Sequence, residues 1–177
     1  TVTSEAAPDY PSVKKAIEGR APVVSGLLAL PSLPTPSVLA VAPILSRDGK
    51  PAGAVGSLID ISQSSISGLA KPLTLGTTGY AEVVDENGIV LARSEPGQPA
   101  RAFEQSDHPG RFAELIREGK ATQGTCHRCH TLEGQPPRDR DVLAFAPLSA
   151  APWGVVIRQA EEEALAPAEE LKQRFLV

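Results

Sequence analysis

Both cysteines of this chain and two of its three histidines lie within eight consecutive residues, GTCHRCHT, which run from Gly124 to Thr131. In that stretch Cys126, Cys129 and His130 form a C-x-x-C-H motif, the spacing at which c-type haem is attached. Two thiols three positions apart can form thioethers with the two vinyl groups of one porphyrin, and the adjacent imidazole reaches the iron as the proximal ligand. The motif predicts covalently bound haem c, with His130 on the iron, in an oxidising compartment outside the cytoplasm.

Two other chemistries fit the same residues. A zinc site needs four ligands, so Cys126, Cys129 and His130 would require His127 or His108 as the fourth. A disulfide or a redox pair of thiols would use the two cysteines alone. Metal binding and disulfide formation therefore stand beside haem as alternatives.

The composition also limits what could surround a haem iron. The chain contains no Met, which excludes a Met-ligated electron carrier within it. The remaining candidates for the sixth iron position are His108, His127, a lysine such as Lys120, or an open position for a gas or water. The apolar side chains near the motif are candidates for a haem wall and equally for an ordinary core: Phe103, Phe112, Leu115, Leu132 and Phe145.

The bulk composition describes a folded, acidic protein. Of the 177 residues 41% are hydrophobic, enough to bury a core, and the net charge is −4 without a basic stripe that could neutralise a run of phosphates. Nucleic acid is therefore not expected as a partner. The longest apolar runs fall short of the roughly 20 residues that span a bilayer. The sequence contains neither a Ser-His-Asp constellation nor a glycine-rich phosphate loop, so we do not expect an enzyme.

An internal repeat organises the chain. Val38–Ile44 reads VLAVAPI and Val142–Leu148 reads VLAFAPL, with starting points 104 residues apart. Upstream of each copy a short motif precedes a helical stretch: Asp9-Tyr10-Pro11 in the first and Asp107-His108-Pro109 in the second. Two ordered matches at nearly one offset indicate two related modules in tandem.

Local patterns predict the elements of each module. Tyr80–Val84 and Ile89–Arg93 flank an Asn-Gly pair, the strongest short signal for a hairpin. Arg111–Glu118 has helical spacing and ends at Gly119. A broken strand region and strands at 142–146 and 153–157 follow, with a helix leaving from Glu161. The first module has a helix near 13–18 and strands at 38–45 and 52–61, and lacks the opening hairpin.

Several stretches resemble a known family. GTTGYAEVVDENGIVLARSEPG, from Gly76 to Gly97, resembles the opening hairpin of the Cache domain, the extracytoplasmic PAS-like sensor of bacterial chemoreceptors and sensor histidine kinases. LAFAPLSAAPWGVVIRQAEEEA is similar to that family's last two strands and exit, and the first module resembles the end of the membrane-distal half of a double Cache domain. The resemblance covers Asp9 to Ala164.

The resemblance implies an α+β fold, a PAS-like antiparallel sheet flanked by helices, with a partial second module at the N-terminus. The expected domains are a partial distal module (1–72), the Cache module with the C-x-x-C-H insert (73–160), and an exit helix (161–177). It also implies a periplasmic part of a membrane-anchored receptor, a homodimer with cytoplasmic signalling output. Lys172 and Arg174 precede an apolar start, typical either of the entrance to a membrane helix or of an ordinary terminal helix.

Two functions fit this architecture. In the first, haem c senses redox state or a diatomic gas, held by Cys126, Cys129 and His130 with His108 as a candidate second axial ligand. In the second, the module binds a short carboxylate or similar solute without haem, and Tyr80, Arg93 and Arg111 are the polar groups expected to contact it. The Tyr-Arg-Tyr-Asp set that grips the ligand in the amino-acid-binding subgroup of the family cannot be traced in this sequence.

Overall fold

A computed structural model describes residues 10–28, 35–61, 75–94, 104–106, 108–127 and 140–175. The chain forms two compact units, Thr1–Ser62 and Gln63–Val177. The predicted boundary between residues 72 and 73 falls outside the described residues. Cys129 and His130 also lie outside them.

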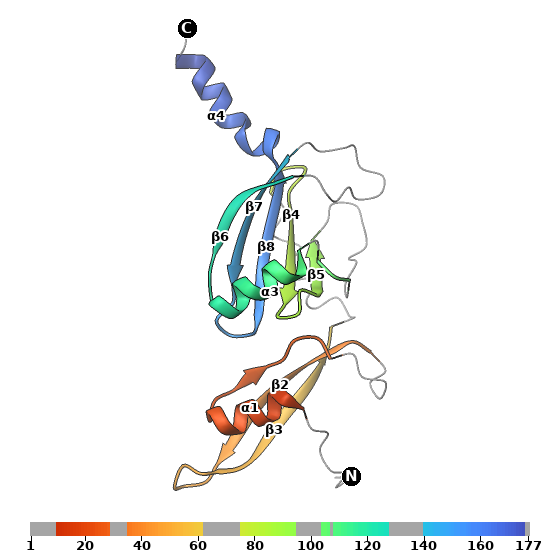
Figure 1. Ribbon diagram of the computed structural model, residues 1–177, viewed down its shortest axis with the longest axis vertical. Helices are drawn as coiled ribbons and strands as arrows, with labels where there is room; N and C mark the ends of the chain where they lie inside the picture. Colours follow the sequence, from red (N-terminus) through yellow and green to blue (C-terminus); the bar gives the residue numbers. More distant parts are fainter. Residues whose placement is uncertain are drawn as a thin grey trace. The chain divides into compact units, whose positions relative to one another are not determined.

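The first unit is a helix on a three-stranded antiparallel sheet. It contains α1 (Pro11–Gly19), β1 (Val23–Val24), β2 (Ser37–Leu45) and β3 (Pro51–Asp60), and its strand order is β1-β2-β3 (Figure 1). Ala16 of α1 packs on Leu39 and Val41 of β2, with Tyr10 and Leu28 at the edge of this cluster. Because strand side chains alternate between faces, Leu39 and Val41 share the face that the helix covers.

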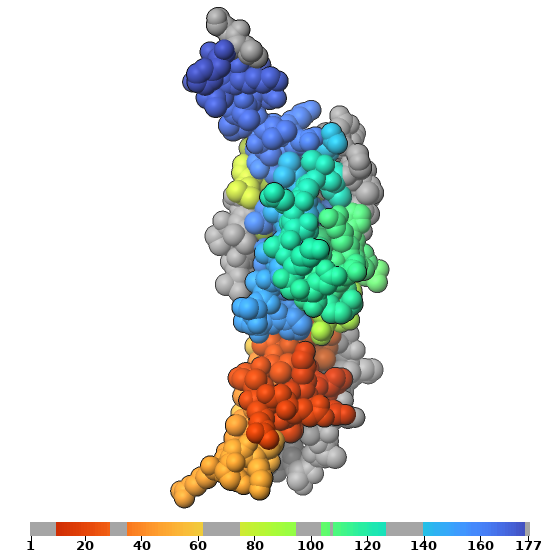
Figure 2. Space-filling model, turned by 60° about the vertical axis from the view of Figure 1, so that its left-hand side comes forward, coloured from red at the N-terminus to blue at the C-terminus, as the bar shows by residue number. Residues whose placement is uncertain are grey.

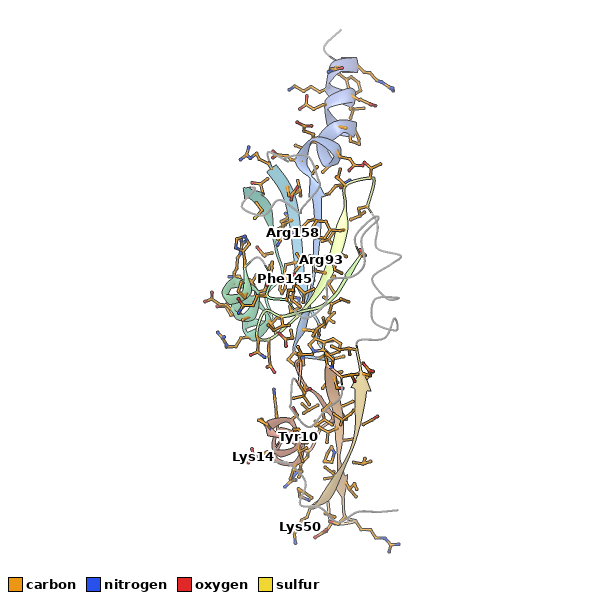
Figure 3. The ribbon with its side chains drawn as sticks, turned by 90° about the vertical axis from the view of Figure 1, so that its right-hand side faces the viewer. Tyr10, Lys14, Lys50, Arg93, Phe145 and Arg158 are labelled. Carbon is orange, nitrogen blue, oxygen red and sulfur yellow. The ribbon has the colours of Figure 1, made fainter. Side chains whose placement is uncertain are left out.

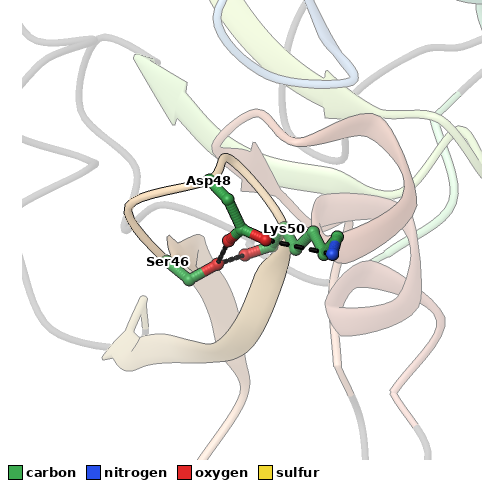
Figure 4. Close-up of polar contacts among 3 residues, drawn as sticks. All are labelled: Ser46, Asp48 and Lys50. Atoms are coloured by element: carbon green, nitrogen blue, oxygen red, sulfur yellow. Dashed lines mark hydrogen bonds and ion pairs between the residues drawn. The ribbon is translucent and has the colours of Figure 1, made fainter.

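A polar turn joins β2 to β3. The Ser46 hydroxyl lies 2.5 Å from Asp48 Oδ1 and 2.8 Å from the carbonyl oxygen of Lys50, and Lys50 Nζ lies 3.0 Å from Asp48 Oδ2 (Figure 4). The hydrogen bond from Ser46 is the largest of the causes that lower the pKa of Asp48, followed by that from Lys50. The Asp48 carboxylate therefore stabilises the turn itself, through its hydrogen bond with Ser46 and its ion pair with Lys50.

The second unit is a five-stranded antiparallel sheet with the order β5-β4-β8-β7-β6 (Figure 1). Its elements are β4 (Tyr80–Asp85), β5 (Val90–Ser94), α3 (Pro109–Glu118), β6 (Thr122–His127), β7 (Arg140–Pro147), β8 (Trp153–Ala160) and α4 (Glu161–Phe175). The predicted hairpin lies in the same sheet as the two predicted C-terminal strands, which confirms the expected α+β fold with a PAS-like antiparallel sheet. The region between α3 and β7, where the sequence predicted only a broken strand, contains a complete strand, β6, at the edge of the sheet.

The hairpin turn between β4 and β5 depends on Asp85 and Gly88. Asp85 Oδ1 accepts hydrogen bonds from the backbone N–H groups of Asn87 and Ile89, both at 2.9 Å. Gly88 has a φ of +75°, and a Cβ there would lie 2.4 Å from the Cα of Pro109 at the start of α3. Only glycine allows this turn to reach the helix so closely.

The core of the second unit lies between the sheet and α3. Its fully buried members are Val84, Val90, Phe112, Leu143, Phe145 and Val156, and Leu115 and Ile116 of α3 pack against them. The rings of Phe112 and Phe145 stack at a centroid distance of 5.4 Å and an interplanar angle of 11°. Of the aromatic residues expected either to line a haem or to form a core, these two form core.

The predicted C-terminal helix is present as α4, which continues through Pro167 and has no buried residue. Figure 2 shows α4 projecting beyond the sheet of its unit. Among the described residues no helix is long and apolar enough to cross a bilayer. The interpretation of Lys172 and Arg174 as the entrance to a membrane helix stays a prediction.

The repeat seen in the sequence has a structural counterpart. In each unit a short helix is followed by an antiparallel meander, β1-β2-β3 in the first and β6-β7-β8 in the second. Leu39 pairs with Leu58 in the first unit, and Leu143, its equivalent at the 104-residue offset, pairs with Arg158. The strand registers therefore give residue-by-residue equivalences between the two units.

Candidate functional site

The face of the five-stranded sheet that α3 covers, here called the inner face, combines apolar and charged side chains. Pairing places Glu82 between Arg93 of β5 and Val156 of β8, and Val156 beside Phe145 of β7. One step along the strands, Tyr80 pairs with Arg158. Strand alternation therefore puts all of these residues on one face, where charged and apolar side chains share the rows that cross the strands.

A buried ion pair lies on the inner face. Arg93 Nε donates to Glu82 Oε1 at 2.6 Å, and Arg93 Nη2 contacts the same oxygen. The side chain of Glu82 is fully buried and that of Arg93 is 7% exposed. Glu82 Oε2 has no hydrogen-bond partner in the described part of the chain. A buried carboxylate oxygen in this condition is costly, so it marks a position where a donor is expected.

Arg158 brings a second buried cation to the same face. It is 3% exposed, and its neighbour in the β4–β8 pairing, Tyr80, is also buried. Figure 3 shows Arg93, Arg158 and Phe145 together in the five-stranded sheet. A guanidinium removed from water is retained only where anionic or strongly polar groups compensate it, and its planar fork matches a carboxylate.

The position equivalent to Arg158 in the first unit carries an apolar residue in a more exposed setting, since Leu58 is 45% exposed and Arg158 is 3% exposed. Arg158 pairs with Leu143 in β7, whereas Leu58 pairs with the equivalent Leu39 in β2. The same position of the same meander thus accepts an apolar side chain. Arg158 is a specific addition to the second unit.

A second pair of polar side chains lies where α3 begins. His108 is the N-cap residue of α3 and makes no capping hydrogen bond with its side chain. Its Nε2 lies 3.4 Å from the Sγ of Cys126 in β6. Cys126 is a free, half-buried thiol. Two residues 18 positions apart in sequence are thus brought together, one at the start of α3 and one in the edge strand β6.

A carboxylate ties α4 to the start of β4. Glu163 accepts hydrogen bonds from the backbone N–H groups of Thr77 and Thr78, at 2.6 and 2.9 Å, and from both hydroxyls. The backbone bond from Thr77 and the hydroxyl of Thr78 are the main causes that lower the pKa of Glu163 to about 2. These hydrogen bonds of Glu163 to Thr77 and Thr78 are here called the clasp. A Cβ at Gly76 would lie 2.2 Å from Glu163 Oε1, so glycine leaves the space that the clasp needs.

The structure separates the three residues expected to bind a solute. Tyr80 and Arg93 lie buried on the inner face, whereas Arg111 is exposed on α3. Of the residues expected to hold haem, Cys126 and His108 come together, and Cys129 and His130 lie outside the described residues. Whether any of them contacts a ligand stays a prediction.

Sequence reasoning missed Glu82 and Arg158. The pattern that could have identified them is a charged residue two positions from an apolar residue in the same strand, because the two side chains then lie on the same face of the sheet. Glu82 is followed by Val84, and Arg158 is preceded by Val156, and both valines are fully buried. Alternation of this kind puts the charge in the interior.

Solved structures with a similar fold are sensor domains. The extracellular domain of mmHK1S-Z3, named as a histidine kinase, shares 17% identity over 92% of this chain and 58% of its own, with a TM-score of 0.65. The ligand-binding domain of the Pseudomonas aeruginosa amino acid chemoreceptor PctB with L-Arg has 20% sequence identity to this chain. The match covers 97% of this chain and 65% of that structure, with a TM-score of 0.53. The ligand-binding domain of the Pseudomonas fluorescens chemoreceptor CtaA with L-isoleucine has 14% sequence identity to this chain. The match covers 92% of this chain and 62% of that structure, with a TM-score of 0.58.

These likenesses support the predicted Cache-type, PAS-like fold at the level of the fold alone. The chain spans about 58% to 65% of the length of these three structures. No protein-family model matches the chain, and no curated protein matches its sequence.

Proposed function

We propose that this chain is an extracytoplasmic sensor domain and that its second unit binds a small solute carrying a carboxylate, such as an amino acid. The observation that carries the proposal is the buried charge on the inner face, Glu82, Arg93 and Arg158, in a unit whose counterpart has leucine at the equivalent of Arg158. The similar folds whose names include amino acid chemoreceptors support the same class of function.

The chemistry of the face suits such a solute. Arg158 offers a planar set of donors for a carboxylate, and Glu82 Oε2 offers an acceptor for an ammonium group. The ring of Phe145 stacks on that of Phe112, and Phe145 lies in the same row as Glu82, on the other side of Val156. A zwitterion with an apolar side chain would suit these groups. Its carboxylate would contact Arg158, its ammonium group would contact Glu82 Oε2, and its side chain would contact the phenylalanine rings.

The receptor context belongs to the same proposal. We propose a periplasmic location and a kinase or chemoreceptor output, which the names of the extracellular domain of a histidine kinase and of the ligand-binding domain of a chemoreceptor support. The membrane anchor and the homodimer are part of the proposal and rest on the sequence resemblance alone. Since those two structures are ligand-binding and sensor domains, we propose binding without catalysis. We propose that the first unit corresponds to part of the membrane-distal half of a double Cache domain.

The experiment uses Arg158→Leu, which introduces the residue of the first unit. L-Amino acids and short carboxylates are tested one by one for a rise in the melting temperature of the whole chain. A solute at about 100 times its Kd stabilises the folded state by about 2.7 kcal/mol. We expect at least one solute to do so in the wild type and none in Arg158→Leu.

Arg140→Leu is the matched control because Arg140 is an exposed arginine of β7, with its side chain 51% exposed. It should keep the response of the wild type. An equal response in Arg158→Leu, or no solute that stabilises the wild type, would contradict the proposal.

Haem c is the second candidate input, favoured by the C-x-x-C-H motif and by the free thiol of Cys126 at its first position. When bound, the group would supply redox or gas-ligand chemistry, with Cys126, Cys129 and His130 as its protein attachments. Expression in a host with haem-maturation machinery should give a Soret band that survives acid-acetone extraction. Replacing both cysteines by Ala should remove it, and His130→Ala should shift the spectrum toward high spin. A wild type without covalent haem would refute this candidate.

A further inference from the structure

The outer edge of β3 is a long strand edge without charge. β3 is the last strand of the three-stranded sheet, and β2 is its only strand neighbour among the described residues. No charged residue occurs from Pro51 to Ile59, and Val55 and Ile59 are exposed. Proteins usually protect an edge strand with charges, proline, bulges or a short length, because its unpaired backbone groups attract another strand. In β3 only the first residues have such protection, from Pro51 and from the register shift beside Leu45.

The hydrogen bonds between β2 and β3 identify the backbone groups that point to this edge. Ile61 N–H donates to the Pro36 carbonyl oxygen at 3.1 Å, and the register of the two strands continues from this pair to Gly53 without a shift. Antiparallel pairs alternate between those that exchange hydrogen bonds and those that do not, so the odd-numbered residues from 53 to 59 also bond to β2. The N–H and C=O groups of the residues between them point to the edge of β3: Ala54, Gly56 and Leu58.

The equivalent strand of the second unit has a partner at this edge. Because Leu58 corresponds to Arg158, β3 corresponds to β8, which pairs with β4 of the β4–β5 hairpin. Ala160 has the same orientation as Arg158 by strand alternation, and its N–H donates to the Thr78 hydroxyl, on the β4 side, at 3.1 Å. The backbone groups of β8 that face the hairpin are therefore the equivalents of those that β3 presents at its edge.

The side chains of β3 indicate the chemistry of a strand that would pair there. In the register of β4 on β8, two of its residues would lie opposite Leu58 and Gly56, where β4 has Tyr80 and Glu82. A Cβ at Gly56 would lie 3.1 Å from Leu39 Cδ1, so the surroundings of this glycine beneath α1 are apolar. A large apolar side chain on the neighbouring strand can cover such a glycine, whereas a charged one would lie beside carbon. The expected strand is therefore apolar at both positions.

We propose that the edge of β3 is a docking surface for an apolar β-hairpin, which pairs antiparallel with β3 as β4–β5 pairs with β8. In the second unit the hairpin precedes the helix and the three-stranded meander, in the chain order β4-β5-α3-β6-β7-β8. By the same order the hairpin of the first unit belongs to a segment of the same polypeptide that precedes α1. The proposal goes beyond the solute site and does not depend on it.

The test joins a hairpin to the N-terminus of the whole chain through a flexible linker as long as the segment between β5 and α3. The hairpin is a second copy of residues 79–94 in which Glu82→Leu and Arg93→Leu make the inner face apolar. The matched control has Glu82→Pro in the copy instead of Glu82→Leu, because proline removes a backbone N–H that faces the neighbouring strand. Exchange of individual backbone amides with D₂O is followed by NMR in the chain alone and in both fusions.

We expect the amides of Gly56 and Leu58 to exchange more slowly in the apolar fusion. A flexible linker gives an effective concentration of about 1 mM, so a hairpin with a Kd of about 0.1 mM slows their exchange about tenfold. The amides of Val55 and Ser57 bond to β2 and should stay protected in all three proteins, which verifies that the sheet is folded. The proline control should exchange like the chain alone. If a fusion does not fold, the hairpin is added to the chain as a synthetic peptide and the same amides are followed.

Unchanged exchange at Gly56 and Leu58 in the presence of the apolar hairpin would overturn the proposal, and so would equal slowing by the proline control. Slow exchange of these amides in the chain alone would also overturn it. If that protection rises with protein concentration, the occupant of the edge is a second copy of the chain. Arg158→Leu in the apolar fusion separates this surface from the solute site, because it should keep the slow exchange while losing the response to solutes.

Discussion

The buried pair of Glu82 and Arg93 makes a quantitative prediction. Glu82→Leu leaves the Arg93 guanidinium, 7% exposed, without the carboxylate that it contacts at 2.6 Å. Two unit charges about 4 Å apart attract by about 4 kcal/mol at an effective dielectric constant near 20. Removing one partner of a buried pair costs about 3–5 kcal/mol, because the other charge stays in the interior. Since a domain is stable by only about 5–15 kcal/mol, this single change should bring the second unit close to unfolding.

The double variant Glu82→Leu/Arg93→Met separates charge from packing. Replacing a whole buried pair by apolar side chains of similar size is often neutral or stabilising by about 1–4 kcal/mol. We therefore expect the double variant to recover most of the stability that Glu82→Leu loses. Its affinity for a solute should nevertheless fall, because the acceptor at Glu82 is missing.

The assay is urea unfolding followed by the fluorescence of Trp153, the chain's single tryptophan, which lies in β8 and reports on the second unit. Glu169→Leu is the matched control, since Glu169 forms an exposed pair with Lys172 on α4 at 3.7 Å and such pairs contribute about 0–1 kcal/mol. The reasoning is refuted if Glu82→Leu costs no more than Glu169→Leu, or if the double variant is as unstable as the single one.

Three further changes test the packing of the second unit by the same fluorescence. Glu163→Gln should remove a pH dependence: the carboxylate has a pKa of about 2 when folded against 4.5 otherwise, so its stabilisation is present above 4.5 and is lost as the pH falls toward 2. The variant should melt lower than the wild type at neutral pH, whereas Glu162→Gln should not. Phe145→Ala should cost about 3–5 kcal/mol, because it empties the stack with Phe112. Gly88→Ala should destabilise the unit through its positive φ and its approach to Pro109, and unchanged stability would contradict the tight turn.

Much of the fold follows from local patterns. The Asn87-Gly88 pair between two apolar runs predicted the hairpin, and helical spacing that ends at Gly119 predicted α3. The edge strand β6 was only partly foreseen, because TQGTCH contains little of the apolar alternation that identifies strands. Its position depends on pairing with β7, a contact that no local signal encodes.

The site was less predictable, since it depends on burial. Arg93 was found from the hairpin motif, but its partner Glu82 resembles an ordinary surface residue until the sheet places it in the interior. Arg111 has the chemistry of a ligand-binding residue but lies exposed on α3. His108 was named from the sequence as a candidate second axial ligand, but its contact with Cys126 depends on where the start of α3 lies relative to β6, which sequence spacing does not encode.

The arrangement of β8 and α4 links the proposed solute site to the end of the described chain. Arg158 lies in β8 two residues before Ala160, and α4 begins at the next residue, Glu161. Ala160 N–H donates to the Thr78 hydroxyl at 3.1 Å, and Glu163 accepts from Thr77 and Thr78, which directly precede the Gly79-Tyr80 start of β4. We therefore expect a solute that displaces Arg158 relative to Tyr80 to move the start of α4, with Glu163, relative to Thr77 and Thr78. Because α4 buries none of its own residues, its direction depends on contacts at its start: the hydrogen bonds of Glu163, the junction with β8, and the ion pair in which Glu161 Oε2 lies 3.6 Å from Arg140 Nε of β7. The size of this movement is limited by how much more tightly the solute binds one arrangement than the other.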